Sequence, residues 1–360
     1  MVYRTFYFCC AVMLLASCNS QQHDPLAFEP PIFPETKQII VTHLPNDFLF
    51  RLPADIVDLG THLAVQMYHA NGFIHIFDKE SGVFVKSFGS RGRGPDEFTI
   101  PPTIRTNEDK TELYAFQLFN GMHDYWTYDV RNILEDNLVR PVRKEEIVLY
   151  LHEGQQYSSS AQDFLAWQDK RLFDIYHFHR FEIQDTLGNT LYTYNEYPKV
   201  RLKEKADSIF FRRSYTSAPI ALKPDMSKFV TASHTGCIME IFDLEASGKM
   251  EKIVEKRFFP PIFEAMQGNA YPVAGETVSG MYDLSATDEL IFGMYHGKTF
   301  YMDDRDFINT IAVFDWLGNP VRRYDLNWCI ESFVVDAKRN RCYLVGVCAD
   351  EDVVLGYFDL

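Results

Sequence analysis

Two histidines, His177 and His179, lie two residues apart in the segment 175–180, Ile-Tyr-His-Phe-His-Arg. In a β-strand both imidazoles would point to the same face, because successive side chains alternate between faces. Converging imidazoles are typical zinc ligands, but a protein zinc site needs at least three side-chain ligands. No third His, Asp or Glu can be placed beside this pair from the sequence. Hydrogen-bonded or solvated strand histidines are therefore favoured over a metal site.

The acidic run Asp303-Asp304-Arg305-Asp306 carries carboxylate oxygens of the kind that Ca²⁺ prefers. It lacks the spacing and the glycine of an EF-hand loop, so a solvated loop is the favoured interpretation. We therefore predict no metal site and no cofactor.

The loop Gly92-Arg93-Gly94 has the glycine content of a phosphate-binding loop. However, no helix N-terminus follows it, and the Lys-Ser/Thr pair of a P-loop is missing. A tight connector between two structural units is the favoured interpretation. Arg91 and Arg93 remain candidates for a binding face.

Two cysteines near the C-terminus, Cys329 and Cys348, are predicted to form a disulfide, which an oxidising exported compartment would permit. Residues 331–336 and 342–347 resemble two antiparallel strands around a turn. If Asp336 pairs with Arg341, the same register extended outward places Cys329 opposite Cys348, within the reach of a disulfide. A slip of one residue would turn the side chains to opposite faces. Two further cysteines are expected to be buried thiols, namely Cys237 and Cys342.

Residues 1–17 have the pattern of a secretory signal: Arg4, then an apolar run, then two small residues. The apolar run is too short to span a bilayer as a helix. The segment 15–18, Leu-Ala-Ser-Cys, resembles a bacterial lipobox. This resemblance implies cleavage before Cys18 and acylation of that residue, with diacylglycerol on the sulfur and a chain such as palmitate on the amine. An ordinary signal peptide with a coincidental cysteine is the alternative.

Residues 18–36 are polar and then rich in proline, which predicts a tether between the lipid anchor and the folded domain. The chain has a formal net charge of −15. Because nucleic-acid binding draws on clustered Lys and Arg, a nucleic-acid partner is not expected. Thirty Phe and twenty Tyr, together with β-branched runs, favour an all-β fold.

A short pattern recurs six times between residues 76 and 359: a strand-like run ends in an apolar or aromatic pair followed by Asp, with one looser copy. A glycine and a second strand-like run follow four of the copies, which is typical of a β-hairpin. Each Asp is expected to bond its own downstream backbone, as in an Asx-turn, and therefore to be structural. The six copies end at Asp78, Asp129, Asp185, Asp243, Asp315 and Asp359.

A period of about 50 residues with about four strands per unit predicts a six-bladed β-propeller over residues 37–360. A kelch-type or seven-bladed ring is the structural alternative. The last unit ends at Asp359 with only about three strands, and an open blade edge would expose unpaired backbone groups. We therefore expect the segment Gln38–Leu44 to complete the last blade and close the ring.

The segment 87–98, Ser-Phe-Gly-Ser-Arg-Gly-Arg-Gly-Pro-Asp-Glu-Phe, resembles the glycine-rich connector of NHL-type propellers. Together with the segment 311–321 and the lipobox, it makes most of the chain similar to the TolB-like six-bladed propeller lipoproteins of Bacteroidetes. The resemblance implies the fold and a location in the cell envelope. The outer membrane is the expected site, with the periplasmic or outer side left open. It implies little chemistry, because most members have no assigned function.

The longest interval between repeats, from Asp243 to Asp315, contains the aromatic residue Tyr271. A longer connector near the central channel of a propeller is a frequent place for function, so Tyr271 is a candidate binding residue. Simple variation in loop length is the alternative.

Two functions remain open at this point. The favoured one is a noncatalytic binding or scaffold role, with an unknown protein, peptide or glycan as ligand and the membrane reached through the lipid anchor. The alternative is a metal-dependent hydrolase or lyase of the six-bladed group, which would require at least three ligands converging on the channel. The sequence contains no constellation that identifies a catalytic residue, so an enzyme is the less favoured interpretation.

Overall fold

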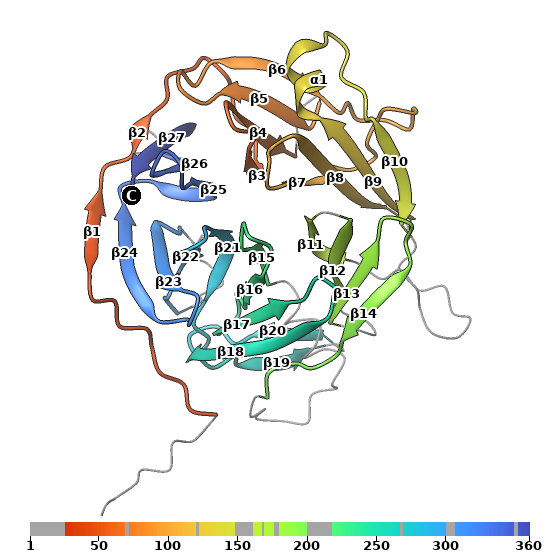
Figure 1. Cartoon of the computed structure of the whole chain (residues 1–360). Helices are drawn as coiled ribbons and strands as arrows, with labels where there is room; N and C mark the ends of the chain where they lie inside the picture. Colours follow the sequence, from red (N-terminus) through yellow and green to blue (C-terminus); the bar gives the residue numbers. More distant parts are fainter. Residues whose placement is uncertain are drawn as a thin grey trace, which may run out of the picture.

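The computed structural model describes residues 26–68, 72–119, 122–147, 161–167, 169–175, 180–199, 218–266, 269–299, 307–348 and 352–360. Six β-sheets surround a common centre (Figure 1). The first strands of neighbouring sheets contact one another around the full circle, which makes them the inner strands of a six-bladed propeller. The predicted all-β, six-bladed fold is therefore confirmed.

Each blade runs outward from the centre as an antiparallel sheet whose strands follow the chain order. Blades one to three consist of β3 (Pro53–Asp58), β4 (His62–Met67), β5 (Ile74–Asp78) and β6 (Phe84–Phe88); β7 (Thr103–Thr106), β8 (Glu112–Phe119), β9 (Met122–Asp129) and β10 (Arg143–Ile147); and β11 (Ala161–Trp167), β12 (Lys170–Ile175), β13 (Phe181–Asp185) and β14 (Thr190–Tyr194).

Blades four to six follow the same plan, and their strands are β15 (Ile220–Leu222), β16 (Lys228–Ala232), β17 (Cys237–Leu244) and β18 (Met250–Phe259); β21 (Met281–Ala286), β22 (Leu290–Tyr295), β23 (Thr310–Asp315) and β24 (Pro320–Leu326); and β25 (Cys329–Asp336), β26 (Arg341–Val347) and β27 (Val353–Asp359).

Two elements are additional to the blades, namely the short helix α1 (Val130–Glu135) after β9 and a hairpin of β19 (Phe263–Met266) and β20 (Asn269–Pro272) between blades four and five. Among the described residues, no helix has the length and hydrophobicity needed to cross a bilayer.

The repeated Asp residues lie at the end of the third strand of each blade, five as its last residue and Asp243 as its last but one. Asp78, Asp185 and Asp315 each accept backbone N–H groups of the following turn, and Asp129 caps α1. The other two form cross-strand ion pairs, Asp243 with Lys228 and Asp359 with Arg341. In each of the six, the carboxylate therefore stabilises local structure.

Apolar side chains fill every seam between neighbouring blades. In blade one, Ile74 and Ile76 pack towards blade two, while Leu63 and Phe77 pack towards blade six. A blade is covered on both faces, so its middle strands are apolar on both faces and do not alternate between apolar and polar residues. Six such seams account for the six hydrophobic clusters of the described chain.

The N-terminal segment lies along the outer edges of three blades. The backbone N–H of Glu29 bonds the carbonyl of Arg257 in blade four, and the Phe33 ring packs on Phe314 in blade five. Strand β1 (Thr36–Ile39) pairs in parallel with β24 of blade five, and β2 (Thr42–His43) pairs with β27 of blade six. The contact region therefore begins before residue 37, where the propeller domain was predicted to begin.

The predicted strand Gln38–Leu44 is divided between two blades. Its second part gives blade six a fourth strand, whereas the parallel pairing of β1 with blade five was not predicted. The closure of the ring by β1 and β2 stays a prediction.

Candidate functional site

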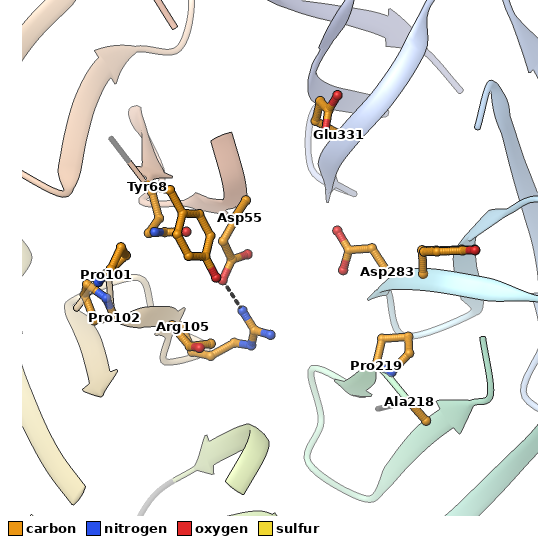
Figure 2. A pocket seen from close by; sticks show the side chains of 13 residues that line it. Asp55, Tyr68, Pro101, Pro102, Arg105, Ala218, Pro219, Asp283 and Glu331 are labelled. Atoms are coloured by element: carbon orange, nitrogen blue, oxygen red, sulfur yellow. Dashed lines mark hydrogen bonds and ion pairs between the residues drawn. The ribbon is translucent and has the colours of Figure 1, made fainter. Parts of the chain in front are cut away.

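A cavity of about 250 Å³ opens among the inner strands at one end of the channel. Five of the six blades line it (Figure 2). Its chemistry comes from three carboxylic acids, one guanidinium, one amide and two phenols. The thirteen lining residues are Ala54, Asp55, Gln66, Tyr68, Pro101, Pro102, Thr103, Arg105, Ala218, Pro219, Tyr282, Asp283 and Glu331.

Irregularities of strand pairing lie beside all three carboxylic acids of the cavity wall. The register shifts between Pro53 and Asp55 in β3, between Met281 and Asp283 in β21, and on either side of Glu331 in β25. A β-bulge bends its strand and redirects a side chain, and bulges are frequent beside functional sites. In β25 the acidic residue itself is the unpaired one, whereas Asp55 and Asp283 are the first paired residues after the shift.

Asp55 and Arg105 form an ion pair that joins blades one and two. Nη1 of Arg105 lies 2.5 Å from Oδ2 of Asp55 and 2.7 Å from the carbonyl oxygen of Ile104. Ile104 itself points away into the apolar seam, because side chains alternate along β7. The guanidinium is therefore held at the cavity wall next to a carboxylate that balances its charge.

Asp283 accepts hydrogen bonds but forms no ion pair within the described part of the chain. Its Oδ1 accepts the backbone N–H of Leu284 at 2.8 Å, and its Oδ2 accepts the Ser332 hydroxyl at 3.0 Å. Burial raises the pKa of Asp283 to about 7, and the nearby charge of Asp55 adds to this effect while that of Arg105 opposes it. Burial also raises the pKa of Glu331.

Gln66 supplies the cavity with an unused hydrogen-bond donor. It lies directly opposite Asp55 in the β3–β4 pairing, so the two side chains leave the sheet on the same face. Gln66 is only 3% exposed, and its Nε2 has no partner among the described residues. A buried amide N–H without a partner costs free energy, so a ligand that accepts this bond is favoured.

The structure does not bring the predicted binding residues to this cavity. Arg91 and Arg93 are exposed on the connector between β6 and β7, where Glu97 accepts the backbone N–H of Gly94. That loop is the inter-blade connector that its glycines predicted. Tyr271 lies in β20, and no residue of the β19–β20 hairpin lines the cavity. In Figure 1 this hairpin lies beside β18, on the other side of the ring from β6.

The predicted pairing of Cys329 with Cys348 is wrong. The register is as expected from Asp336 opposite Arg341 as far as Ser332 opposite Val345. The bulge at Glu331 then shifts it by one residue, so that Cys329 lies opposite Val347. Both cysteines are free thiols. Two more free thiols, those of Cys237 and Cys342, are buried as expected.

Three of the predicted chemical features lie outside the described residues, namely Cys18, the pair His177 and His179, and the acidic run 303–306. Within the described ranges, no group of three or more His, Cys, Asp or Glu side chains is arranged to hold a metal ion.

The family of the chain follows from a comparison with family models. Residues 32–338 match the model of the TolB-like 6-blade propeller-like proteins, and the chain belongs to this family. No curated protein matches the chain.

Solved structures share the fold at low sequence identity. A Bacteroides fragilis protein named as exported is 13% identical, with a TM-score of 0.52, and the match covers 90% of this chain and 98% of that one. A member of the DUF4221 family from Bacteroides vulgatus is 10% identical, with a TM-score of 0.54 and coverage of 89% and 97%. The β-propeller domain of Myceliophteria thermophila Cps50 is also 10% identical, with a TM-score of 0.53 and coverage of 87% and 98%. These similarities establish the fold alone.

Sequence reasoning missed every residue that gives the cavity its chemistry. Asp55, Arg105 and Asp283 lie in first strands, whereas the Asp repeat marks third strands. One signal was present, since Asp55 and Asp283 each interrupt a short apolar run in the segment that precedes a blade's second strand, and Arg105 stands in the corresponding segment of blade two. Collecting the polar residues of those segments would have pointed to the channel.

Proposed function

We propose that this chain is a noncatalytic binding protein of the cell envelope, anchored by acylated Cys18, that takes a small ligand at the mouth of its channel. The observation that carries the proposal is one cavity whose wall holds Asp55, Asp283 and Glu331, each beside an irregularity in the pairing of its inner strand. Such irregularities are frequent beside functional sites.

The location is supported by the lipobox resemblance and by the exported protein among the structures of similar fold. A metal-dependent hydrolase or lyase is not favoured, because its mechanism needs three ligands close enough to share one ion, and no three His, Cys, Asp or Glu side chains of the described residues are arranged in that way. The cavity offers hydrogen-bonding groups and charge, which are sufficient for recognition.

Filling the cavity tests the binding function. Ala54 is exposed on the wall, so Ala54→Trp would occupy the space without entering the apolar core. We expect a screen of neutral sugars, amines, carboxylic acids and short peptides by thermal shift to yield ligands that stabilise the wild type but not Ala54→Trp. Leu187→Trp, at a side chain 84% exposed in a turn of blade three, is the matched control and should retain binding. Ligands that bind Ala54→Trp equally well, or that are chemically converted, would contradict the proposal.

Cell fractionation tests the anchor separately. Cys18→Ser is expected to move the protein from the membrane to the soluble fraction, because the residue that takes the lipid is gone. Unchanged membrane association of the variant, with no lipid label on the wild type, would refute lipid anchoring.

A further inference from the structure

The charges of the cavity wall do not balance. The wall holds the carboxyl groups of Asp55, Asp283 and Glu331 against one guanidinium, that of Arg105. Arg105 lies 2.5 Å from Asp55. In the described structure, neither Asp283 nor Glu331 forms an ion pair, and burial raises the pKa of both. A positive charge placed beside either carboxyl group would stabilise its ionised form.

The donors of the cavity lie at its other side. In Figure 2, Arg105 and Asp283 project toward the same space from opposite walls. Gln66 neighbours Asp55 on the Arg105 side and has an unpartnered buried Nε2. The cavity thus has an acceptor side on blades five and six and a donor side on blades one and two.

We propose that the cavity recognises a small molecule with a primary ammonium group, which binds Asp283 and Glu331, and with an oxygen acceptor that receives a hydrogen bond from Gln66. This inference rests on the binding function proposed above and names the class of ligand. Amino acids, amino alcohols and amino sugars all combine the two groups, and the cavity volume suits molecules of their size.

Binding of the ammonium group is linked to proton release. The charged and titratable groups around Asp283 are Asp55 and Arg105 from blades one and two and Glu331 and Cys342 from blade six. Below pH 7 Asp283 is mostly protonated, so its proton must leave for the solvent before the carboxylate can pair with the ammonium group. With one such carboxyl, the ionised fraction falls about tenfold from pH 8 to pH 6, and the affinity falls with it.

Calorimetry with matched ligands tests the proposal. The probes are alanine, ethanolamine and glucosamine, each compared with its N-acetyl form, which keeps the oxygen acceptors but lacks the positive charge. We expect at least one amine to bind at pH 8 and its N-acetyl form to bind at least tenfold more weakly. At pH 6, where Asp283 is mostly protonated, binding should release a proton, which appears as a dependence of the measured heat on the buffer. The three probes distinguish a carboxylate, a hydroxyl group and a sugar ring as the source of the acceptor. For alanine and ethanolamine, whose amines stay protonated, affinity should fall about tenfold at pH 6.

Two variants separate this inference from the proposed function. Asp283→Asn keeps the shape and an acceptor for Ser332, and should lose both the pH dependence and at least tenfold in affinity. Asp288→Asn, at an exposed carboxylate in the turn of the same hairpin, should behave as the wild type. A neutral ligand that binds the wild type but not Ala54→Trp, with no preference for amines, would refute the ammonium site and leave the binding function intact. If no probe and no screened ligand binds, both fail.

Discussion

Lys79 lies between Asp58 and Asp336 at the seam of blades one and six, whereas Asp283 and Glu331 on the channel wall have no ion-pair partner among the described residues. The Nζ of Lys79 is 2.5 Å from Asp58 and 2.6 Å from Asp336, and its side chain is 0% exposed. Both groups of carboxylates are shielded from water to some degree. They differ in whether the protein itself supplies the cation.

The pKa values follow that difference. Burial alone would raise the pKa of Asp336, but the hydrogen bond and charge of Lys79 outweigh it, and the pKa is lowered. Burial raises the pKa of Asp283 to about 7, and the Ser332 hydroxyl does not compensate. At the seam the charges hold two blades together, whereas on the channel wall the unbalanced charge is left for a ligand.

The largest effect is expected from removing the N-terminal strands that pair with blades five and six. Deleting residues 36–44 removes β1 and β2, together with the buried side chains of Val41 and Leu44, and uncovers the edges of β24 and β27. Open edges invite intermolecular pairing, so we expect aggregation or loss of cooperative unfolding in size-exclusion chromatography and thermal melts. A chain beginning at residue 26 keeps the Phe33 contact and should stay monomeric and folded. A monomeric deletion variant with native melting would show that the ring closes without β1 and β2.

A smaller, still severe effect is expected at the seam cation. Lys79→Met removes the buried ammonium group between Asp58 and Asp336, which keep only the longer ion pairs with Lys110 at 3.8 Å and with Arg339 at 3.9 Å. Removing one partner of a buried ion network costs about 3–5 kcal/mol, which urea unfolding at pH 7 would measure. Lys249→Met removes an exposed pair with Glu245 and should leave the unfolding midpoint unchanged. Equal stability of the two variants would mean that the seam does not depend on its charges.

The fold was predictable because its signal is local. The Asp-containing turn after each third strand follows from neighbouring residues, so the repeat, the blade count and the inter-blade connector at Gly92 could all be inferred from the sequence. The parallel docking of β1 on β24 could not, since it joins segments almost 290 residues apart. No feature of the sequence marks the bulge at Glu331. Because of this bulge, Cys329 lies opposite Val347 and not opposite Cys348, and Glu331 could not be predicted as a cavity residue.

The smallest effect has the opposite sign and distinguishes the channel wall from the seam. The pKa of Asp283 is about 7 in the folded state, against about 3.9 for an unfolded carboxyl. The folded state therefore binds the proton more tightly, and the stability that this gives is lost as the pH rises from about 4 to 7. Asp283→Asn cannot ionise, so at pH 8 the variant avoids the cost of a buried charge and should be more stable than the wild type. Water in the open cavity screens part of that charge, so we expect a gain of only about 1–2 kcal/mol in the free energy of unfolding. The difference should be smaller at pH 5. Asp336→Asn is the matched comparison and should destabilise the protein, because it takes a partner from Lys79. Urea unfolding of both variants at the two pH values measures this contrast, and a loss of stability in Asp283→Asn at pH 8 would place Asp283 with the structural carboxylates of the seams.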